Sequence, residues 1–108
     1  MSTAQLLTWT PIKKSIAASS MLVADTIPLS RFNTVEYIVS LVSSAPVKEK
    51  HLKLSVFKDD TQVNDSVHGR YGDLNVSINA VVSGSDVQIQ LTNGETFIVD
   101  VKLLRAIL

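Results

Sequence analysis

The amino-acid sequence predicts an all-β protein: a two-sheet antiparallel β-sandwich of about seven strands with an N-terminal extended arm. Apolar and polar side chains alternate along most of the chain after residue 25, as in half-buried strands. Turn-forming residues separate the alternating runs at intervals of about 8 to 12 residues, and no convincing helical period follows residue 28. Strands with one apolar face must bury it against a second layer, so the pattern favours a sandwich, with an open barrel as second choice.

The N-terminal residues 1–24 are expected to form an arm or an edge strand, and residues 25–108 the sandwich domain. Within residues 5–12, Pro11 disfavours both a helix interior and a central strand, so this part is expected to be extended. Residues 13–24 fit a helical period about as well as a strand alternation, and their serine-rich composition favours a strand.

The middle of the chain shows four further segments. Residues 25–31 carry Ile27 and Leu29 around Pro28, which confines them to an edge or a strand start. Residues 35–42 alternate with a partly apolar second face, which predicts a central strand covered on both sides. Residues 43–50 form the longest polar stretch and are expected to be a loop or an exposed edge. Residues 52–56 predict a half-buried strand that ends in a turn at Asp59 and Asp60.

The second half begins with a short expected strand at residues 62–67 and a glycine-rich turn, HGRYG, at residues 68–72. Residues 74–82 show the cleanest alternation and lead through SGSD into the final segment. There, two alternating runs flank Asn93 and Gly94, and both residues tolerate the positive φ of a hairpin turn. We therefore predict a β-hairpin over residues 85–108, with its last strand held by an apolar face.

Composition excludes several classes of function. The 108 residues carry ten basic and ten acidic side chains and no basic stripe, so no nucleic-acid partner is expected. Cysteine is absent, which rules out disulfides and thiolate metal sites. No apolar run approaches the roughly 18 residues of a membrane span, so no membrane partner is expected. The N-terminus lacks the features of a secretory signal, which predicts a protein that is made in a cytoplasm and stays soluble.

No group of side chains predicts catalysis or metal binding. His51 and His68 have no third ligand nearby and are expected to be exposed loop residues, so no metal or cofactor is predicted. Asp59, Asp60 and Asp65 lack the alternate spacing, glycine bend and closing glutamate of a calcium loop, and turn formation explains them better. No GxSxG motif surrounds any serine. The chain is therefore expected not to be an enzyme, and a hydrolase that depends on either histidine ranks last.

Two apolar groups predict contacts with other molecules. The first is the expected partner-binding arm, which either adds a strand to the protein's own core or docks on a neighbouring subunit with Trp9 as anchor; it comprises Leu6, Leu7, Trp9 and Ile12. The second consists of side chains that point away from the main apolar faces and favour oligomerisation: Ile38, Val42, Val81 and Ile98.

From about residue 27 onward the order of the segments resembles a family. Residues 37–41 (YIVSL), 54–60 (LSVFKDD), 68–93 (HGRYGDLNVSINAVVSGSDVQIQLTN) and 101–108 (VKLLRAIL) follow one another as in a small β-sandwich module of tailed-bacteriophage virion structural proteins. Such modules occur in tail, neck, fibre and decoration proteins, including those of large cyanobacterial phages. The resemblance covers about three quarters of the chain and implies a virion location, no catalytic residues and a homo-oligomer, with a trimer favoured.

These expectations combine into one hypothesis with stated alternatives. The chain is expected to be an oligomeric head decoration or cement protein that stabilises the capsid, with the major capsid protein or other virion proteins as partners. A neck, collar, baseplate or tail-fibre component is the alternative within the same class. A receptor- or glycan-binding β-sandwich module comes from a different class, and Tyr71 is its one obvious exposed aromatic residue.

Overall fold

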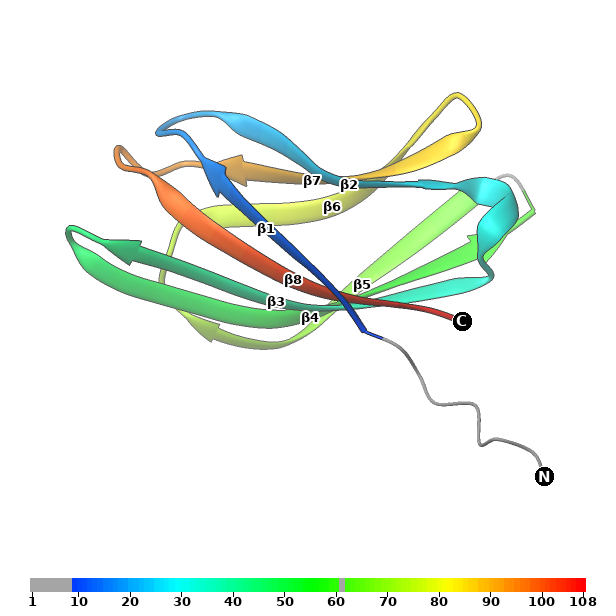
Figure 1. The fold of residues 1–108 in the computed structure, drawn as a ribbon, viewed down its shortest axis with the longest axis horizontal. Helices are drawn as coiled ribbons and strands as arrows, with labels where there is room; N and C mark the ends of the chain where they lie inside the picture. Colours follow the sequence, from blue (N-terminus) through cyan, green and yellow to red (C-terminus); the bar gives the residue numbers. More distant parts are fainter. Residues whose placement is uncertain (1–8, 61) are drawn as a thin grey trace.

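The computed structural model describes residues 9–60 and 62–108 and confirms the predicted all-β sandwich (Figure 1). It has eight strands and one short 3-10 turn at Leu29–Arg31. The strands are β1 (Thr10–Ile16), β2 (Met21–Pro28), β3 (Thr34–Ser44), β4 (Val47–Asp59), β5 (Gln62–Gly72), β6 (Val76–Ser83), β7 (Asp86–Asn93) and β8 (Val99–Ile107). Within the described part of the chain, no helix has the length and apolar character needed to cross a membrane.

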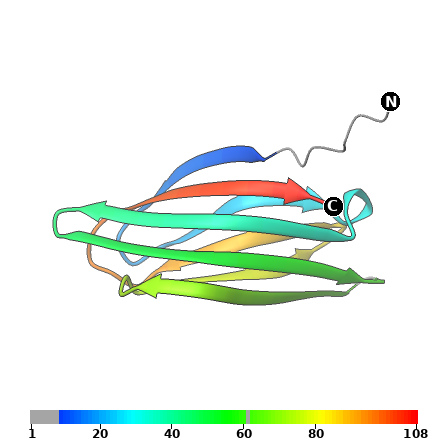
Figure 2. The same ribbon diagram turned by 90° about the horizontal axis from the view of Figure 1, so that it is seen from below.

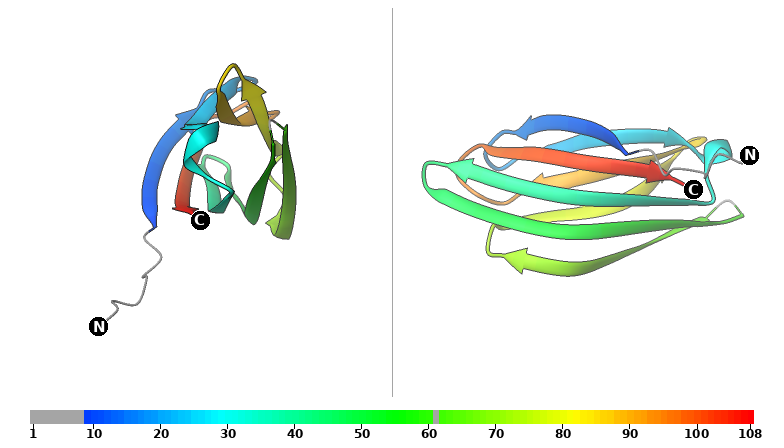
Figure 3. Two further views of the ribbon diagram at one scale, coloured as in Figure 1. Left: turned by 90° about the vertical axis from the view of Figure 1, so that its right-hand side faces the viewer. Right: turned by 60° about the horizontal axis from the view of Figure 1, so that its bottom comes forward.

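The strands form two antiparallel sheets that face each other as layers (Figure 3). The larger sheet has the order β1-β8-β3-β4-β5 and the smaller one the order β2-β7-β6. Figure 2 shows β8 in red between β1 in blue and β3 in cyan-green, so the last strand of the chain pairs on both sides. This confirms that the C-terminal strand is held in place by its apolar face, because Val99, Val101 and Leu103 are buried.

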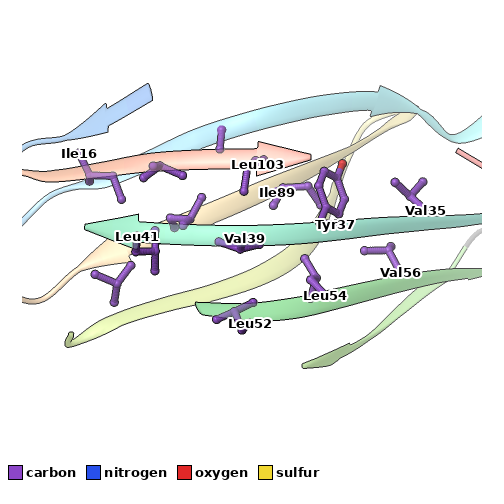
Figure 4. Packing of buried hydrophobic residues seen from close by; sticks show 14 of the residues in the cluster. Ile16, Val35, Tyr37, Val39, Leu41, Leu52, Leu54, Val56, Ile89 and Leu103 are labelled. Atoms are coloured by element: carbon purple, nitrogen blue, oxygen red, sulfur yellow. The ribbon is translucent and has the colours of Figure 1, made fainter. Parts of the chain in front are cut away.

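The core lies between the two sheets and follows from the period-2 alternation of the sequence. In β3, for example, Val35, Tyr37, Val39 and Leu41 are buried while the residues between them face outward. Figure 4 shows these side chains between the layers together with those of neighbouring strands. Branched aliphatic residues from both sheets fill the rest of this space, which is why the fold needs no disulfide.

The predicted C-terminal hairpin is wrong. β7 pairs with β2 and β6 in the smaller sheet, whereas β8 pairs with β1 and β3 in the larger one. Residues 94–98 therefore cross from one sheet to the other, and neither Asn93 nor Gly94 adopts a positive φ. The Asn93 side chain instead is buried, and its Nδ2 donates to the carbonyl oxygens of Ile16, Ala17 and Phe97 at 3.2, 3.2 and 2.9 Å. The sequence alone does not distinguish an asparagine whose side chain forms hydrogen bonds at a crossover between sheets from one that forms a tight turn.

Two polar or glycine-rich segments are longer strands than predicted. Residues 43–50 do not form a loop, since β3 and β4 pair continuously up to a turn at Ala45 and Pro46. The segment 68–72 is not a turn but part of β5, which pairs with β4 as far as Gly72. Gly69 has a φ of +65° where the register shifts opposite Leu52, so its backbone freedom serves a β-bulge. Glycine there accommodates an extra residue without ending the strand.

The N-terminal segments belong to both sheets. Residues 13–24 are strands joined by a short turn at residues 17–20, which confirms the preference for strand over helix. β1 forms an edge of the larger sheet and β2 an edge of the smaller one, and β2 continues across residue 24, where the arm was expected to end. β3 is central in its sheet as predicted, but it is covered on one face only, because Ile38 is 39% exposed and Val42 is 42% exposed.

A bulge in β2 creates a polar link between the sheets. The pairing of β2 with β7 shifts between Val23 and Asp25, and this places Asp25 opposite buried Ile89 on the inner face. The Tyr37 hydroxyl donates to Oδ2 of Asp25 at 2.7 Å, and Nη1 of Arg105 lies 3.1 Å from both carboxylate oxygens. One side chain of the smaller sheet thus contacts two neighbouring strands of the larger sheet.

The buried phenol of Tyr37 should make the protein less stable at alkaline pH. Burial, then the hydrogen bond and negative charge of Asp25, raise the pKa of Tyr37 far above its usual value of 10.0, against a smaller opposing effect of Arg105. In the unfolded chain Tyr37 ionises near the usual value. Its contribution to the free energy of unfolding is therefore complete below that pH and declines as the pH rises above it.

Tyr37→Phe should cost about 1 kcal/mol of unfolding free energy at pH 8. The difference between wild type and variant should shrink by about 1.4 kcal/mol per unit above pH 10 in denaturant titrations. A difference that stays constant from pH 8 to pH 11 would contradict this assignment.

The crossover should depend on the amide of Asn93. Asn93→Asp keeps the shape but replaces the Nδ2 donors with an oxygen that faces three carbonyl groups, so we expect a loss of about 2 to 4 kcal/mol in unfolding free energy. The neighbouring exposed Thr92 provides the control, and Thr92→Ala should change stability by about 0.5 kcal/mol or less. Chemical denaturation measures both, and equal losses would refute the role of the amide.

Candidate interaction surface

The larger sheet has one face toward the core and one toward solvent, and we call the second the outer face. Residues opposite each other in the register project to the same side, so the pairings define rows of outward side chains across the strands. The central row, which we call the basic row, crosses β1, β8, β3, β4 and β5 in the order Lys13, Lys102, Ser40, His51 and Tyr71. The next row on one side is Pro11, Leu104, Ile38, Lys53 and His68, and on the other side Ser15, Asp100, Val42 and Glu49.

An open hollow of about 570 Å³ lies on the outer face at the β1 end of the basic row. Lys13, Lys102, Ser40 and Val42 line it, together with Asp100 and other residues of β1 and β8. Ser15 Oγ donates to Asp100 Oδ1 at 2.8 Å, which fixes the carboxylate at one side. The hollow therefore combines cations, hydroxyls and a small apolar wall.

The opposite end of the basic row holds His51 and Tyr71. The two rings stack with centroids 6.3 Å apart and planes inclined by 24°. His51 Nε2 lies 2.9 Å from Oε1 of Glu49, and Tyr71 is 67% exposed. Both residues lie on strands rather than in the loops that the sequence suggested, because β4 and β5 extend beyond their expected ends.

His68 lies in an arrangement that superficially resembles a hydrolase site. Ser55 Oγ donates to Oε1 of Glu36 at 2.9 Å, and His68 Nε2 lies 3.1 Å from the same hydroxyl oxygen. When the Ser55 hydroxyl donates to Glu36, the tautomer of His68 with a proton on Nε2 can donate to the same hydroxyl oxygen. These three side chains link the neighbouring strands β3, β4 and β5. Ser55 was not singled out in the sequence, since no motif marks it.

The acidic residues considered as a calcium site do not converge. Asp59 ends β4 and Asp60 follows in the turn with a φ of +59°, which confirms the predicted turn. Asp65 lies in β5, and its Oδ2 accepts a hydrogen bond from the backbone N–H of Ala80 on β6 at 2.7 Å. Across the described residues, no three His, Cys, Asp or Glu side chains are placed to hold a metal ion.

The expected partner-binding arm divides into three parts. Leu6 and Leu7 lie outside the described residues. Trp9 directly precedes β1 and is 36% exposed, whereas Ile12 lies opposite Leu103 and packs against the core. Ile12 thus belongs to the protein's own sandwich, and docking of the arm on a neighbour stays a prediction.

Of the four apolar side chains expected on the surface, Ile38, Val42 and Ile98 are exposed and Val81 is half-buried.

Comparison with known proteins shows which solved structures have a similar fold. No family model and no curated protein matches the sequence. Among solved structures, the tailspike protein of Acinetobacter baumannii phage AM24 is similar over 94% of this chain, with a TM-score of 0.53 and 10% identity. The chain corresponds to only 26% of that tailspike chain.

Two further tailspike structures overlap less well. They come from Acinetobacter phage vB_ApiP_P1 (11% identity, 97% of this chain, 23% of that chain) and A. baumannii bacteriophage Fri1 (10% identity, 91% of this chain, 17% of that chain). Both have a TM-score of 0.49. The likeness to the AM24 protein shows a shared fold: this chain has the architecture of one part of a phage tailspike.

Substitutions should separate the two N-terminal apolar residues. Ile12→Ala removes a side chain that packs against the core and should lower the unfolding free energy by about 1 to 3 kcal/mol. Trp9→Ala removes a ring that is more than a third exposed, so its cost should stay below about 1 kcal/mol. Thermal or chemical denaturation of both variants makes the comparison. An equal loss for Trp9→Ala would show that Trp9 belongs to the core.

Proposed function

We propose that this chain is a structural domain of a bacteriophage virion and that it belongs to a tail appendage. The observation that carries the proposal is the likeness of 94% of the chain to one part of the AM24 phage tailspike. The order of segments in the sequence, which resembles virion β-sandwich modules, supports the same class independently. The chain accounts for about a quarter of the tailspike, so the activity of that whole protein is not part of the proposal.

The physical features of the molecule suit a structural part. The two sheets bury a continuous core. Among the described residues, β1 and β5 are the edge strands of the larger sheet, and many side chains of the outer face between them are exposed. Edge strands and exposed side chains on a sheet face can contact neighbouring subunits without a change of fold.

A tail position differs from the head decoration role expected from the sequence. The occurrence of a similar fold in a tailspike supports the proposed tail position. Binding to the major capsid protein and reinforcement of the head stay predictions, as does a trimer. In the proposed assembly, the segment around Trp9 contacts a neighbouring copy or another virion protein.

Immunogold labelling of assembled particles tests the proposal. Antibodies raised against the purified chain should label the tails of particles of the phage that encodes it. Label on the heads would overturn the tail position and support the decoration role. Particles that carry no label, and no band of the chain in a protein gel, would refute a virion function altogether.

A further inference from the structure

A cleft lies at one side of the sandwich, between the edge strands β5 and β6 of the two sheets (Figure 3). Over the described residues no backbone ladder joins these strands, and side chains of the larger sheet bond to the backbone of β6 instead. We infer that this β5–β6 cleft binds an organic carboxylate with a short apolar group, whose oxygens contact Lys50, Arg70 and the backbone N–H of Ile78. The inference does not rest on the proposed function, because it uses only groups that line the cleft.

The cleft has a volume of about 190 Å³ and combines cationic and polar groups with apolar walls. Lys50 and Leu52 line it from β4, and Val67 and Arg70 line it from β5. The other lining residues directly precede β6 or belong to it: Asn75, Val76, Ser77 and Ile78. None of these residues is acidic.

The first argument concerns the edge of β6 that faces the cleft. Along an antiparallel strand, the N–H and C=O groups of alternate residues point to the same side. The carbonyl oxygen of Val76 accepts from Nζ of Lys50 at 2.7 Å, and the N–H of Ala80 donates to Oδ2 of Asp65 at 2.7 Å. Ile78 lies midway between these two residues, so its N–H also points away from β7. Within the described part of the chain this N–H has no acceptor, and a bound carboxylate supplies one.

The second argument is that two cations reach the cleft. Lys50 continues the inward alternation of Leu52 and Leu54, which carries its ammonium group into the space between the sheets. Burial, and then the positive charge of Arg70, lower the pKa of Lys50, and no carboxylate opposes these two effects. Neither cation belongs to an ion pair among the described residues. An anion that binds between them offsets their repulsion, so the electrostatics of the cleft favour a negatively charged ligand.

Two carboxylates lie near the cleft but do not line it. Oδ2 of Asp65 accepts from the N–H of Ala80, and Oε2 of Glu95 accepts from the N–H of Asn75 at 2.9 Å. Both carboxylates keep their negative charge, but each is directed at a backbone group outside the space where the ligand would lie. The charged groups within the cleft are therefore the two cations.

The third argument is the apolar wall, which favours an organic anion over an inorganic one. Leu52 and Val76 are buried, and Val67 and Ile78 are half-buried. The cleft volume of about 190 Å³ is several times the roughly 30 Å³ share of one water molecule. It accommodates a carboxylate with a few carbon atoms, and burial of each CH₂ group strengthens binding by about fourfold. Phosphate or acetate would leave the apolar wall in contact with water.

Two other occupants fit this cleft less well. An added peptide strand would pair with the edge of β6, but Lys50 and Asp65 already bond backbone groups of that edge on both sides of Ile78. An acidic side chain of a neighbouring protein has the same carboxylate but only one or two CH₂ groups, so it covers little of the apolar wall. The chain length of the best ligand therefore distinguishes a small molecule from a protein partner.

NMR titrations of the isotope-labelled full chain test the inference. The probes are hexanoate, propionate and 1-hexanol, which offer a charge with a long tail, a charge with a short tail, and a tail without charge. We expect hexanoate to shift the amide signal of Ile78 saturably and to bind at least about tenfold more tightly than the other two probes. Absence of a saturable shift, or equal binding of 1-hexanol, would overturn the inference. Equal binding of propionate would also overturn it and indicate an acidic side chain of a protein partner.

Two arginine variants with the same change of charge locate the site. Arg70→Gln removes the exposed cation of the cleft and should weaken hexanoate binding by about tenfold. Arg31→Gln removes an exposed cation outside the cleft and should leave binding within about twofold. Equal affinities of the two variants would refute the assignment to this cleft.

A second pair of variants tests the lysine. Lys50→Met keeps the length of the side chain and should also weaken hexanoate binding by about tenfold, whereas Lys53→Met on the outer face of the same strand should change it by less than about twofold. Lys50 also bonds to Val76, so melting temperatures of all four variants accompany the titrations. Weaker binding by Lys50→Met together with wild-type binding by Arg70→Gln would show that Lys50 only supports the fold, and this would contradict the inference. Immunogold labelling measures none of these quantities, so failure of one proposal is distinguishable from failure of the other.

Discussion

The geometry of the sandwich depends on one carboxylate between its layers. Apolar burial presses the two sheets together but has no direction, and it tolerates sliding of one sheet over the other. Asp25 on the smaller sheet bonds to Tyr37 and Arg105 on the larger one, and its oxygens admit few relative positions of β2, β3 and β8. These contacts fix the alignment of strands whose other inward side chains are nearly interchangeable aliphatic residues. The backbone pairing of β8 with β1 and β3 decides which residues face outward with Lys102.

The sequence was informative where the alternation of side chains was enough. Val35, Tyr37, Val39 and Leu41 are buried as the period-2 pattern predicts, and the two-layer architecture follows from such runs. The alternation did not predict which strands pair with each other. Asn93 and Gly94 carry the composition of a hairpin turn, yet tertiary hydrogen bonds to Ile16, Ala17 and Phe97 determine their structure. Ile16 and Ala17 precede Asn93 by 77 and 76 positions, and nothing in the local sequence indicates contacts at such a separation.

The same reason explains why the candidate site could not be predicted. The expectation focused on Leu6, Leu7, Trp9 and Ile12, which are neighbours in sequence, and the structure places Ile12 against the core. The basic row instead takes one residue from each of five strands, and Lys13 and Lys102 are separated by most of the chain. Their opposition depends on the pairing of β1 with β8, which no pattern of apolar residues encodes. The sequence indicates that Tyr71 is an exposed aromatic residue, but it does not indicate that the ring of His51 stacks on it.

The central claim is that β8 lies between β1 and β3, because this arrangement creates both the core and the outer face. Nuclear Overhauser effects between backbone protons, measured by NMR on the isotope-labelled chain, test it most directly. The account predicts cross-strand contacts of Lys102 with both Lys13 and Ser40, and of Val101 with Leu41. Contacts of β8 with β7 across a turn at Asn93 and Gly94, in place of these, would contradict the topology and the outer face that depends on it.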